Sequence, residues 1–185
     1  MKTGSVQVRG AAVFVILFVV GVALAAALGG VFNAINGRVS PLYFATIIGW
    51  TGVSNIWWAS IEQGIKQATL IGCVLSALLS IGLAVMSRGK CPLDLGLHFL
   101  MGVFAAISLC WTFGGIVAIW MVLKYTAFYR QTFIGVPDEV GEMVRYAWVG
   151  GSIWGAYAGS VLSIAVAFVI FRARRKRHYE RNTAH

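Results

Sequence analysis

The residue best suited to chemistry is His98, which follows Asp94 by four positions at the start of an uncharged segment. Residues four apart share one face of a helix, so the carboxylate could orient the imidazole as a base or a metal ligand. The other two histidines, His178 and His185, lie near the C-terminus. A lone histidine near a membrane interface more often caps or packs, so we expect no catalytic residue, no cofactor and no metal.

The three cysteines favour a modification over a disulfide. Cys73 and Cys110 fall inside apolar segments, whereas Cys91 stands in a short polar stretch beside Arg88 and Lys90. The predicted outer loops contain no cysteine, which excludes a disulfide within them. A cysteine next to a membrane surface is a candidate for S-palmitoylation, and Cys91 is therefore either such a site or a free thiol.

Acidic residues are missing from every long apolar segment of the chain. Carboxylates inside a membrane mark proton relays and ion pathways in many transporters, so their absence argues against a proton-coupled transporter. The sequence also contains no GxSxG, HExxH, CxxC or phosphate-binding glycine motif. We therefore expect a protein that is not an enzyme.

A basic cluster directly follows the last apolar segment. Its members are Arg172, Arg174, Arg175, Lys176 and Arg177. Such a cluster attracts the anionic lipids of a cytoplasmic leaflet, by about 1 kcal/mol per basic residue. Much of the net charge of +9 thus lies directly after the last predicted span, where basic residues help to anchor a helix in the membrane. We expect membrane lipids as partners and no binding of nucleic acid.

Long apolar segments must position these side chains. Of the 185 residues, 59% are hydrophobic and 11% are charged, against about 25% charged in soluble domains. This composition excludes a soluble globular protein, a disordered chain and a coiled coil. Roughly 20 apolar residues cross a bilayer as a helix. Four segments qualify as spans, namely 11–32, 67–86, 95–123 and 147–171. The sequence predicts an all-α integral membrane protein: residues 1–185 form one four-helix transmembrane bundle, with 172–185 as a basic cytoplasmic tail.

Two segments leave alternatives open. Residues 41–60 carry no charge, but they include three tryptophans and several poor helix formers. This composition favours a small extramembrane element in the first outer loop over a fifth span. The first apolar segment could be a cleaved signal peptide, because Ala23-Leu24-Ala25 resembles a cleavage site. Its apolar run exceeds the usual core of such a signal.

The distribution of basic residues predicts the topology. A four-span chain places ten of its 15 basic residues at the termini and in the 87–94 turn. The positive-inside rule then makes both termini cytoplasmic. The first outer loop is expected at about 33–66 and the second at 124–146. We favour the plasma membrane as the location.

Every predicted span carries small residues at four-residue steps, which brings them close to one helix face. Small residues let helix backbones approach closely in lipid, where hydrophobic burial does not drive association. The pattern indicates a tight bundle, with some ridges free to serve contacts between copies. The candidate packing residues are Gly21, Ala25, Gly29, Gly72, Ser76, Gly102, Ala106, Gly114, Gly151, Gly155 and Gly159.

Aromatic residues gather in both predicted outer loops. Tryptophan, tyrosine and arginine are common at binding hot spots, although aromatic residues also form ordinary belts at membrane interfaces. The candidate partner-binding residues are Trp50, Trp57, Trp58, Phe128, Tyr129 and Arg130.

The order of spans and loops resembles the claudin and peripheral-myelin-protein superfamily of tetraspan proteins. Similar features are the Trp50 and Asn55-Ile56-Trp57 motif of the first loop, Lys66 before the second span and Trp111 in the third. The cysteine pair that claudins carry in their first loop is missing. The resemblance implies a non-enzymatic protein that organises membrane or cell contacts, such as junctions, through its outer loops.

Two other functions fit the same sequence. The chain could be a helical accessory subunit of a transporter or membrane enzyme complex. It could also form a small oligomeric channel with charged residues of its loops at the mouth. Partners in each case are membrane proteins or further copies of the chain.

Overall fold

A computed structural model describes the backbone of residues 10–183 and the side chains of residues 11–174. This part of the chain forms six helices and no strand. Four are long and apolar enough to cross a membrane: α1 (Gly10–Val39), α3 (Ile56–Ser87), α4 (Leu93–Lys124) and α6 (Val140–Thr183). The predicted all-α, four-helix architecture is confirmed.

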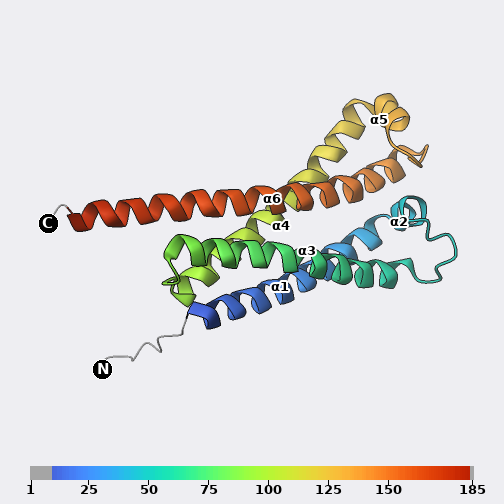
Figure 1. The fold of residues 1–185 in the computed structure, drawn as a ribbon. Helices are drawn as coiled ribbons and strands as arrows, with labels where there is room; N and C mark the ends of the chain where they lie inside the picture. Colours follow the sequence, from blue (N-terminus) through green and yellow to red (C-terminus); the bar gives the residue numbers. More distant parts are fainter. Residues whose placement is uncertain (1–9, 184–185) are drawn as a thin grey trace, which may run out of the picture.

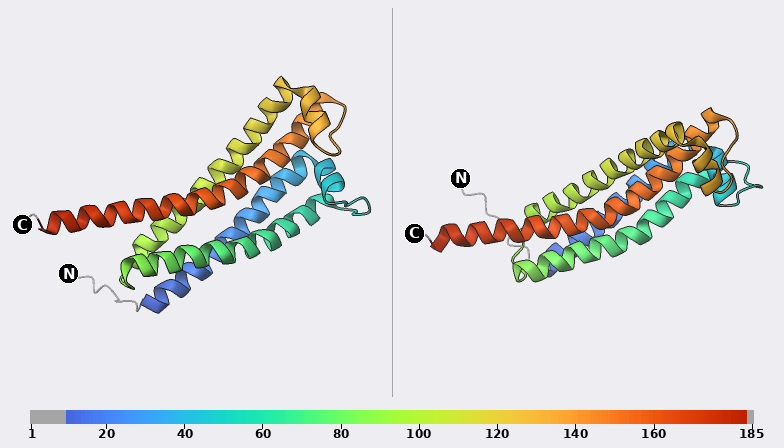
Figure 2. Two further views of the ribbon diagram at one scale, coloured as in Figure 1. Left: turned by 45° about the horizontal axis from the view of Figure 1, so that its top comes forward. Right: turned by 90° about the horizontal axis from the view of Figure 1, so that it is seen from above.

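The four long helices run alternately up and down, and each packs mainly on one partner. α1 packs against α3 and α4 against α6, while the contacts between these two pairs are sparser (Figure 1). The other views show α4 and α6 crossing and both connecting loops gathered at one end (Figure 2). We call that end the loop end, and the opposite end, with Gly10 and the 88–92 turn, the terminal end.

Two short helices lie at the loop end, α2 (Pro41–Ile47) and α5 (Thr126–Thr132). α2 begins where Ser40 Oγ accepts a hydrogen bond from the Tyr43 backbone N–H, and Pro41 suits the first helical turn. α3 begins in the same manner, because Asn55 Oδ1 accepts from the Trp58 backbone N–H at 3.0 Å. Short polar caps thus fix where the chain turns.

The first outer loop is shorter than predicted. α1 continues through residues 33–39 and α3 starts at Ile56, so only residues 40–55 connect them. The extra turns stay helical because Asn33 and Ser60 exchange hydrogen bonds, Nδ2 to the Ser60 carbonyl and Ser60 Oγ to the Asn33 carbonyl. Residues 41–60 contain α2, a non-helical stretch and the first turn of α3, and do not form another long helix.

Small residues bring α1 and α3 into backbone contact at four-residue intervals. A side-chain carbon on Gly29 would collide with the backbone of Gly64 and with Ala68. Gly72 faces Ala25 in the same manner, and Gly21 faces Ser76. The two predicted ridges therefore lie against each other along the whole interface.

The same arrangement joins α4 to α6. A carbon on Gly114 would meet the backbone of Gly151 and Gly155, and one on Gly159 would meet Cys110. Ala118 closes the row against Gly151. Backbone-to-backbone approach of this kind strengthens dispersion contacts in lipid.

Gly102 departs from the packing prediction. A carbon on Gly102 would have nothing within 4 Å, and Ala106 is only half-buried. The physical reason is drift: a four-residue step turns about 40° past a full helical revolution, so Gly102 lies about 120° around α4 from Gly114. In this chain the start of the α4 ridge borders an open groove between α4 and α6 and makes no close backbone contact with α6.

Candidate functional site

The two loops at the loop end are attached to one another. Gly135, at φ +68°, lies directly against the Thr46 side chain, and a side-chain carbon there would collide with it. The Tyr146 hydroxyl on α6 donates a hydrogen bond to the Ile134 carbonyl at 2.6 Å. The second loop is therefore fixed both to the first loop and to the bundle.

Aromatic rings fill the space beneath the loops. Tyr43 packs against Tyr146 with ring centroids 5.0 Å apart, and Phe44 stacks on Trp50 at 5.7 Å. Phe44 is fully buried, and Gly150 leaves room on α6 for the Tyr43 ring. Such contacts add to burial, at about 0.5–1.5 kcal/mol per aromatic pair. The loops are consequently held in one arrangement before any partner arrives.

Burial also makes the phenols beneath the loops harder to ionise. Burial raises the pKa of Tyr129 to about 12, and the nearby Tyr146 and Tyr43 phenols add to the shift. Burial likewise raises the pKa of Tyr43, with a smaller contribution from Tyr157. Deprotonation of either hydroxyl therefore requires a more alkaline pH than deprotonation of a free tyrosine.

The six predicted partner-binding residues separate into two groups. Trp50 stacks on Phe44, whereas Tyr129 packs against Phe133 with ring centroids 4.4 Å apart and is 5% exposed. Trp57 joins α3 to α1: its Nε1–H donates to the Ala34 carbonyl at 3.0 Å, and the Arg38 guanidinium lies 4.4 Å from its ring centre. These three rings support the fold.

The other three candidates reach the surface. Trp58 is 61% exposed and Phe128 is 55% exposed. Arg130 is also exposed, but it donates to the Asp138 carbonyl and lies 3.9 Å from the Asp138 carboxylate. Of the six, only Trp58 and Phe128 present a largely free ring.

Reasoning from the sequence missed the exposed aliphatic residues of the loops. Ile134, beside the Gly135 turn, is 80% exposed, and other large apolar side chains at this end are also exposed. We call this set the apolar tip. It comprises Ile47, Ile48, Val53, Phe128, Phe133 and Ile134. The signal was present in the sequence as apolar residues beside turn-forming glycines, Ile47-Ile48-Gly49 and Phe133-Ile134-Gly135.

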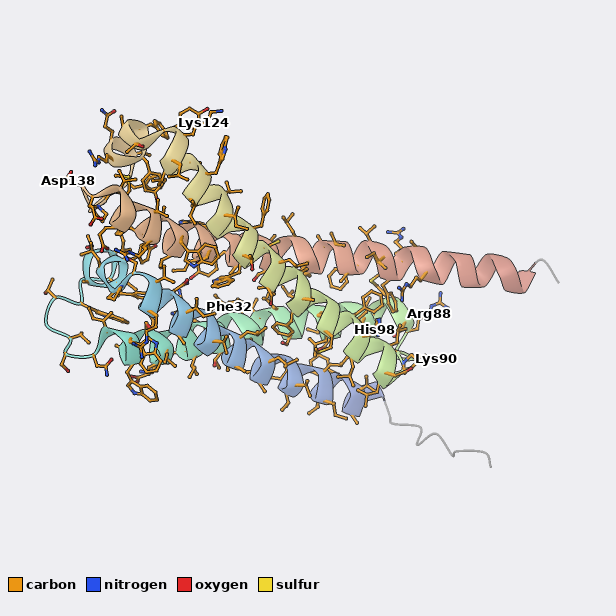
Figure 3. All side chains as sticks on the ribbon, turned by 180° about the vertical axis from the view of Figure 1, so that it is seen from behind. Phe32, Arg88, Lys90, His98, Lys124 and Asp138 are labelled. Atoms are coloured by element: carbon orange, nitrogen blue, oxygen red, sulfur yellow. The ribbon has the colours of Figure 1, made fainter. Side chains whose placement is uncertain are left out.

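Charges of both signs surround the apolar tip. Lys124 and Asp138 mark this end of the molecule in Figure 3. The Lys66–Glu62 and Arg145–Glu142 ion pairs lie nearer the spans. The charged residues of this end are Arg38, Glu62, Lys66, Lys124, Arg130, Asp138, Glu139, Glu142 and Arg145. Charged side chains in this number favour a position of the loops outside the apolar layer of the membrane.

The terminal end carries the other predicted residues. Cys91 is half-buried between α3 and α4, and burial raises the pKa of its thiol, as does the nearby Asp94 carboxylate. A raised pKa leaves less of the reactive thiolate at neutral pH. His98 is exposed, and the structure gives no hydrogen bond between this residue and Asp94, both of which are described.

The basic cluster begins on the same helix that forms the fourth span. The helix α6 continues through Thr183, and Arg172 and Arg174 are exposed. The side chains of Arg175, Lys176 and Arg177 lie outside the described residues. Arg174 and His98 flank a groove of about 380 Å³ between α4 and α6, and Gly102 and Ala106 line it. Palmitoylation at Cys91 and lipid contact by the tail stay predictions.

Comparison with protein-family models, with curated proteins and with solved structures finds no match to this chain.

Proposed function

We propose that the chain is a non-enzymatic membrane protein that binds a partner membrane protein through the apolar tip. The observation that carries this proposal is the exposure of Ile134 and its neighbours on loops that are held by a buried aromatic cluster. Exposed apolar patches rimmed by polar residues mark sites of interaction. The resemblance to claudin-like tetraspan proteins implies a role in organising membrane or cell contacts, and this expectation also favours binding of a partner protein.

The chemistry of this surface favours a protein over a lipid. The loop end as a whole carries five basic and four acidic residues, which gives no strong preference for an anionic headgroup. Large apolar and aromatic side chains at the centre, with charges at the rim, are the composition of protein interfaces. Because the loops are already fixed, binding loses little conformational entropy.

Site-specific photocrosslinking in native membranes tests the proposal. A benzophenone amino acid replaces Ile48 in the first loop or Ile134 in the second, and mass spectrometry identifies the adducts. We expect one and the same protein to be captured from both positions. A crosslinker at Val169, an exposed residue of the fourth span, serves as the control and should not capture that protein.

A charge substitution then measures the contribution of the tip. Ile134→Asp should weaken recovery of the captured protein at least about tenfold, the equivalent of about 1.4 kcal/mol. Surface expression should stay unchanged, because the side chain is exposed. Adducts with lipid only, adducts with further copies of the chain only, or different proteins from the two loops would each overturn the proposal.

A further inference from the structure

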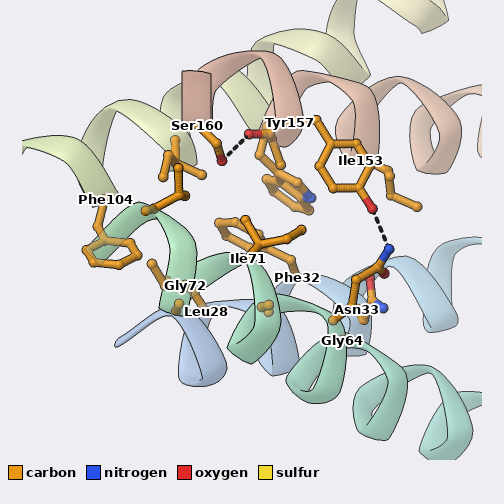
Figure 4. A pocket seen from close by; sticks show the side chains of 18 of the residues that line it. Leu28, Phe32, Asn33, Gly64, Ile71, Gly72, Phe104, Ile153, Tyr157 and Ser160 are labelled. Atoms are coloured by element: carbon orange, nitrogen blue, oxygen red, sulfur yellow. Dashed lines mark hydrogen bonds between the residues drawn. The ribbon is translucent and has the colours of Figure 1, made fainter. Parts of the chain in front are cut away.

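A cavity lies where the two helix pairs meet. Its volume is about 110 Å³, and all four long helices line it. In Figure 4, Leu28, Phe32 and Asn33 of α1 form one side, with Tyr157 and Ser160 of α6 opposite. The cavity exists because each helix packs tightly within its own pair, which leaves the space between the pairs less completely filled.

The cavity is polar at one end and apolar at the other. Asn33, Asn36 and Gln67 line the end toward the loops, whereas Leu28, Leu75 and Phe104 line the deeper part. Along α1 the lining runs from Ala25 to Asn36, about 16 Å at 1.5 Å per residue. The shape suits a slender molecule with one polar end.

An unpartnered donor lies in the polar end. Asn36 is 0% exposed, its Oδ1 accepts a hydrogen bond from Ser152 Oγ at 3.2 Å, and its Nδ2 has no partner. The Nε1–H of Trp111, another lining residue, is also buried without a partner. An unpaired buried polar group costs about 1–3 kcal/mol, so each such group calls for an explanation.

The chemistry of the two unpaired donors defines the kind of ligand atom that could bind them. An indole N–H can only donate, so Trp111 needs an acceptor oxygen. Phosphate or carboxylate is disfavoured because the lining residues carry no charge. An uncharged carbonyl oxygen is an acceptor for a donor of either kind and suits the apolar walls of the cavity.

The opening of the cavity lies beside Gln67, the first residue of the second predicted span. Gln67 is the one exposed residue of the lining, and its Nε2 donates to the Tyr157 hydroxyl at 2.5 Å. This bond links α3 to α6 across the opening. The adjoining Lys66 pairs with Glu62 in an exposed position. Because charged side chains favour the membrane–water interface, we expect Gln67 to lie beside the lipid headgroups.

We propose that this cavity binds one acyl chain of a membrane phospholipid from the leaflet at the loop end. The ester carbonyl accepts hydrogen bonds from Asn36 Nδ2 and Trp111 Nε1, and the chain lies against Leu28, Leu75 and Phe104. The headgroup stays outside, beyond Gln67. This binding site is independent of the partner at the apolar tip.

Photolabelling in nanodiscs tests the proposal. The probe is phosphatidylcholine with a diazirine in one acyl chain, mixed with unlabelled phosphatidylcholine around the purified full chain. We expect labelled peptides to include the cavity wall around Leu28, Leu75 and Ile107. Labelling confined to surface residues such as Leu109 would overturn the proposal and would leave water as the occupant.

Two matched variants give the control. Ala156→Phe fills the cavity, whereas Ala158→Phe makes the same change at an exposed position of α6. The first should lower labelling of the cavity wall at least about tenfold, and the second should leave it unchanged. Equal labelling of the two folded variants would contradict the proposed site.

Asn36→Leu provides a second measurement that does not depend on filling the cavity. Leucine removes the unpaired donor together with the acceptor of the Ser152 hydroxyl, which keeps its bond to the Val149 carbonyl. The thermal midpoint in lipid-free detergent should therefore change little. The same variant should retain phosphatidylcholine about tenfold less well in native mass spectrometry. Unchanged lipid retention would show that Asn36 does not bind the carbonyl.

Discussion

Individual small residues decide which helices of this protein can touch. Gly64 and Gly29 place their backbones in direct contact, and no larger side chain fits at either position. Gly102 has the same residue type in the same kind of sequence pattern, yet it faces open space. The role of a glycine in this chain therefore depends on which face of its helix it occupies and on what lies against that face.

Leucine substitutions at these two glycines should give opposite results. Gly64→Leu forces α1 and α3 apart, and we expect a loss of about 3 kcal/mol or more in unfolding free energy. Gly102→Leu is the matched control and should be neutral, or slightly stabilising through its better helix propensity. Thermal unfolding in detergent micelles measures both. Equal destabilisation would mean that Gly102 is also packed.

Tyr129 should make the protein sensitive to alkali. Its pKa is about 12 in the folded protein, against the ordinary value of 10, so the folded state holds the proton more tightly. Stability is then complete below about pH 10 and falls as the pH rises from 10 toward 12.

A titration of the unfolding midpoint between pH 9 and 12 measures this effect. Tyr129→Phe removes the ionisable hydroxyl and should flatten the decline over that range, relative to wild type. An identical decline in both proteins would assign the alkaline sensitivity to other groups, such as Tyr43.

At the scale of elements, the ends of α1 and α3 continue past the predicted spans as a paired extension. Asn33, Ser60 and Trp57 satisfy backbone groups of the opposite helix there. These bonds add to the close contact between Gly37 and Ser60, which continues the small-residue interface from deeper in the bundle. The extension supports α2, and through it the loop that carries the exposed isoleucines.

Two adjacent tryptophans on α3 allow a comparison of a ring that joins the helices with a ring that is exposed. Trp57→Phe removes the hydrogen bond to the Ala34 carbonyl and should cost about 1 kcal/mol of unfolding free energy. Trp58→Phe, the neighbouring exposed ring, should leave the unfolding free energy unchanged. Denaturation of both variants in the same detergent is the measurement. A loss at Trp58 equal to that at Trp57 would contradict the assignment.

At the scale of the whole molecule, two tight helix pairs meet along a looser seam. The tight contacts are within pairs, and the cavity lies between them. The loops and the 88–92 turn lie at opposite ends (Figure 3). With four spans, these two ends face opposite sides of the membrane.

The positive-inside rule predicts which side each end faces, and labelling of thiols tests it. In a background with Cys73 and Cys110 replaced, Cys91 reports on the terminal end and Val53→Cys on the loop end. A membrane-impermeant maleimide at pH 8.5 should label only the loop-end cysteine in intact cells. Cys91 should react after permeabilisation. The reverse pattern would place the termini outside.

Much of the candidate site could not be predicted from residue types alone. Trp50, Trp57 and Tyr129 share the aromatic character of Trp58 and Phe128, but only tertiary contacts separate the rings held by neighbouring helices from the exposed ones. The small-residue series does continue through Ser60 and Gly64, a signal in the sequence that α3 begins early. The claudin-like resemblance stays a prediction.

The sequence by itself determined the four apolar helices, because runs of uncharged residues of bilayer length have no stable alternative in lipid. It also determined the small-residue ridges that let helices approach. Only the tertiary structure decided which ridges meet, because the drift of a four-residue step and the crossing of α4 over α6 set the direction of each side chain. It alone brought Asn36 and Trp111 to one cavity, since their side chains come from helices of different pairs.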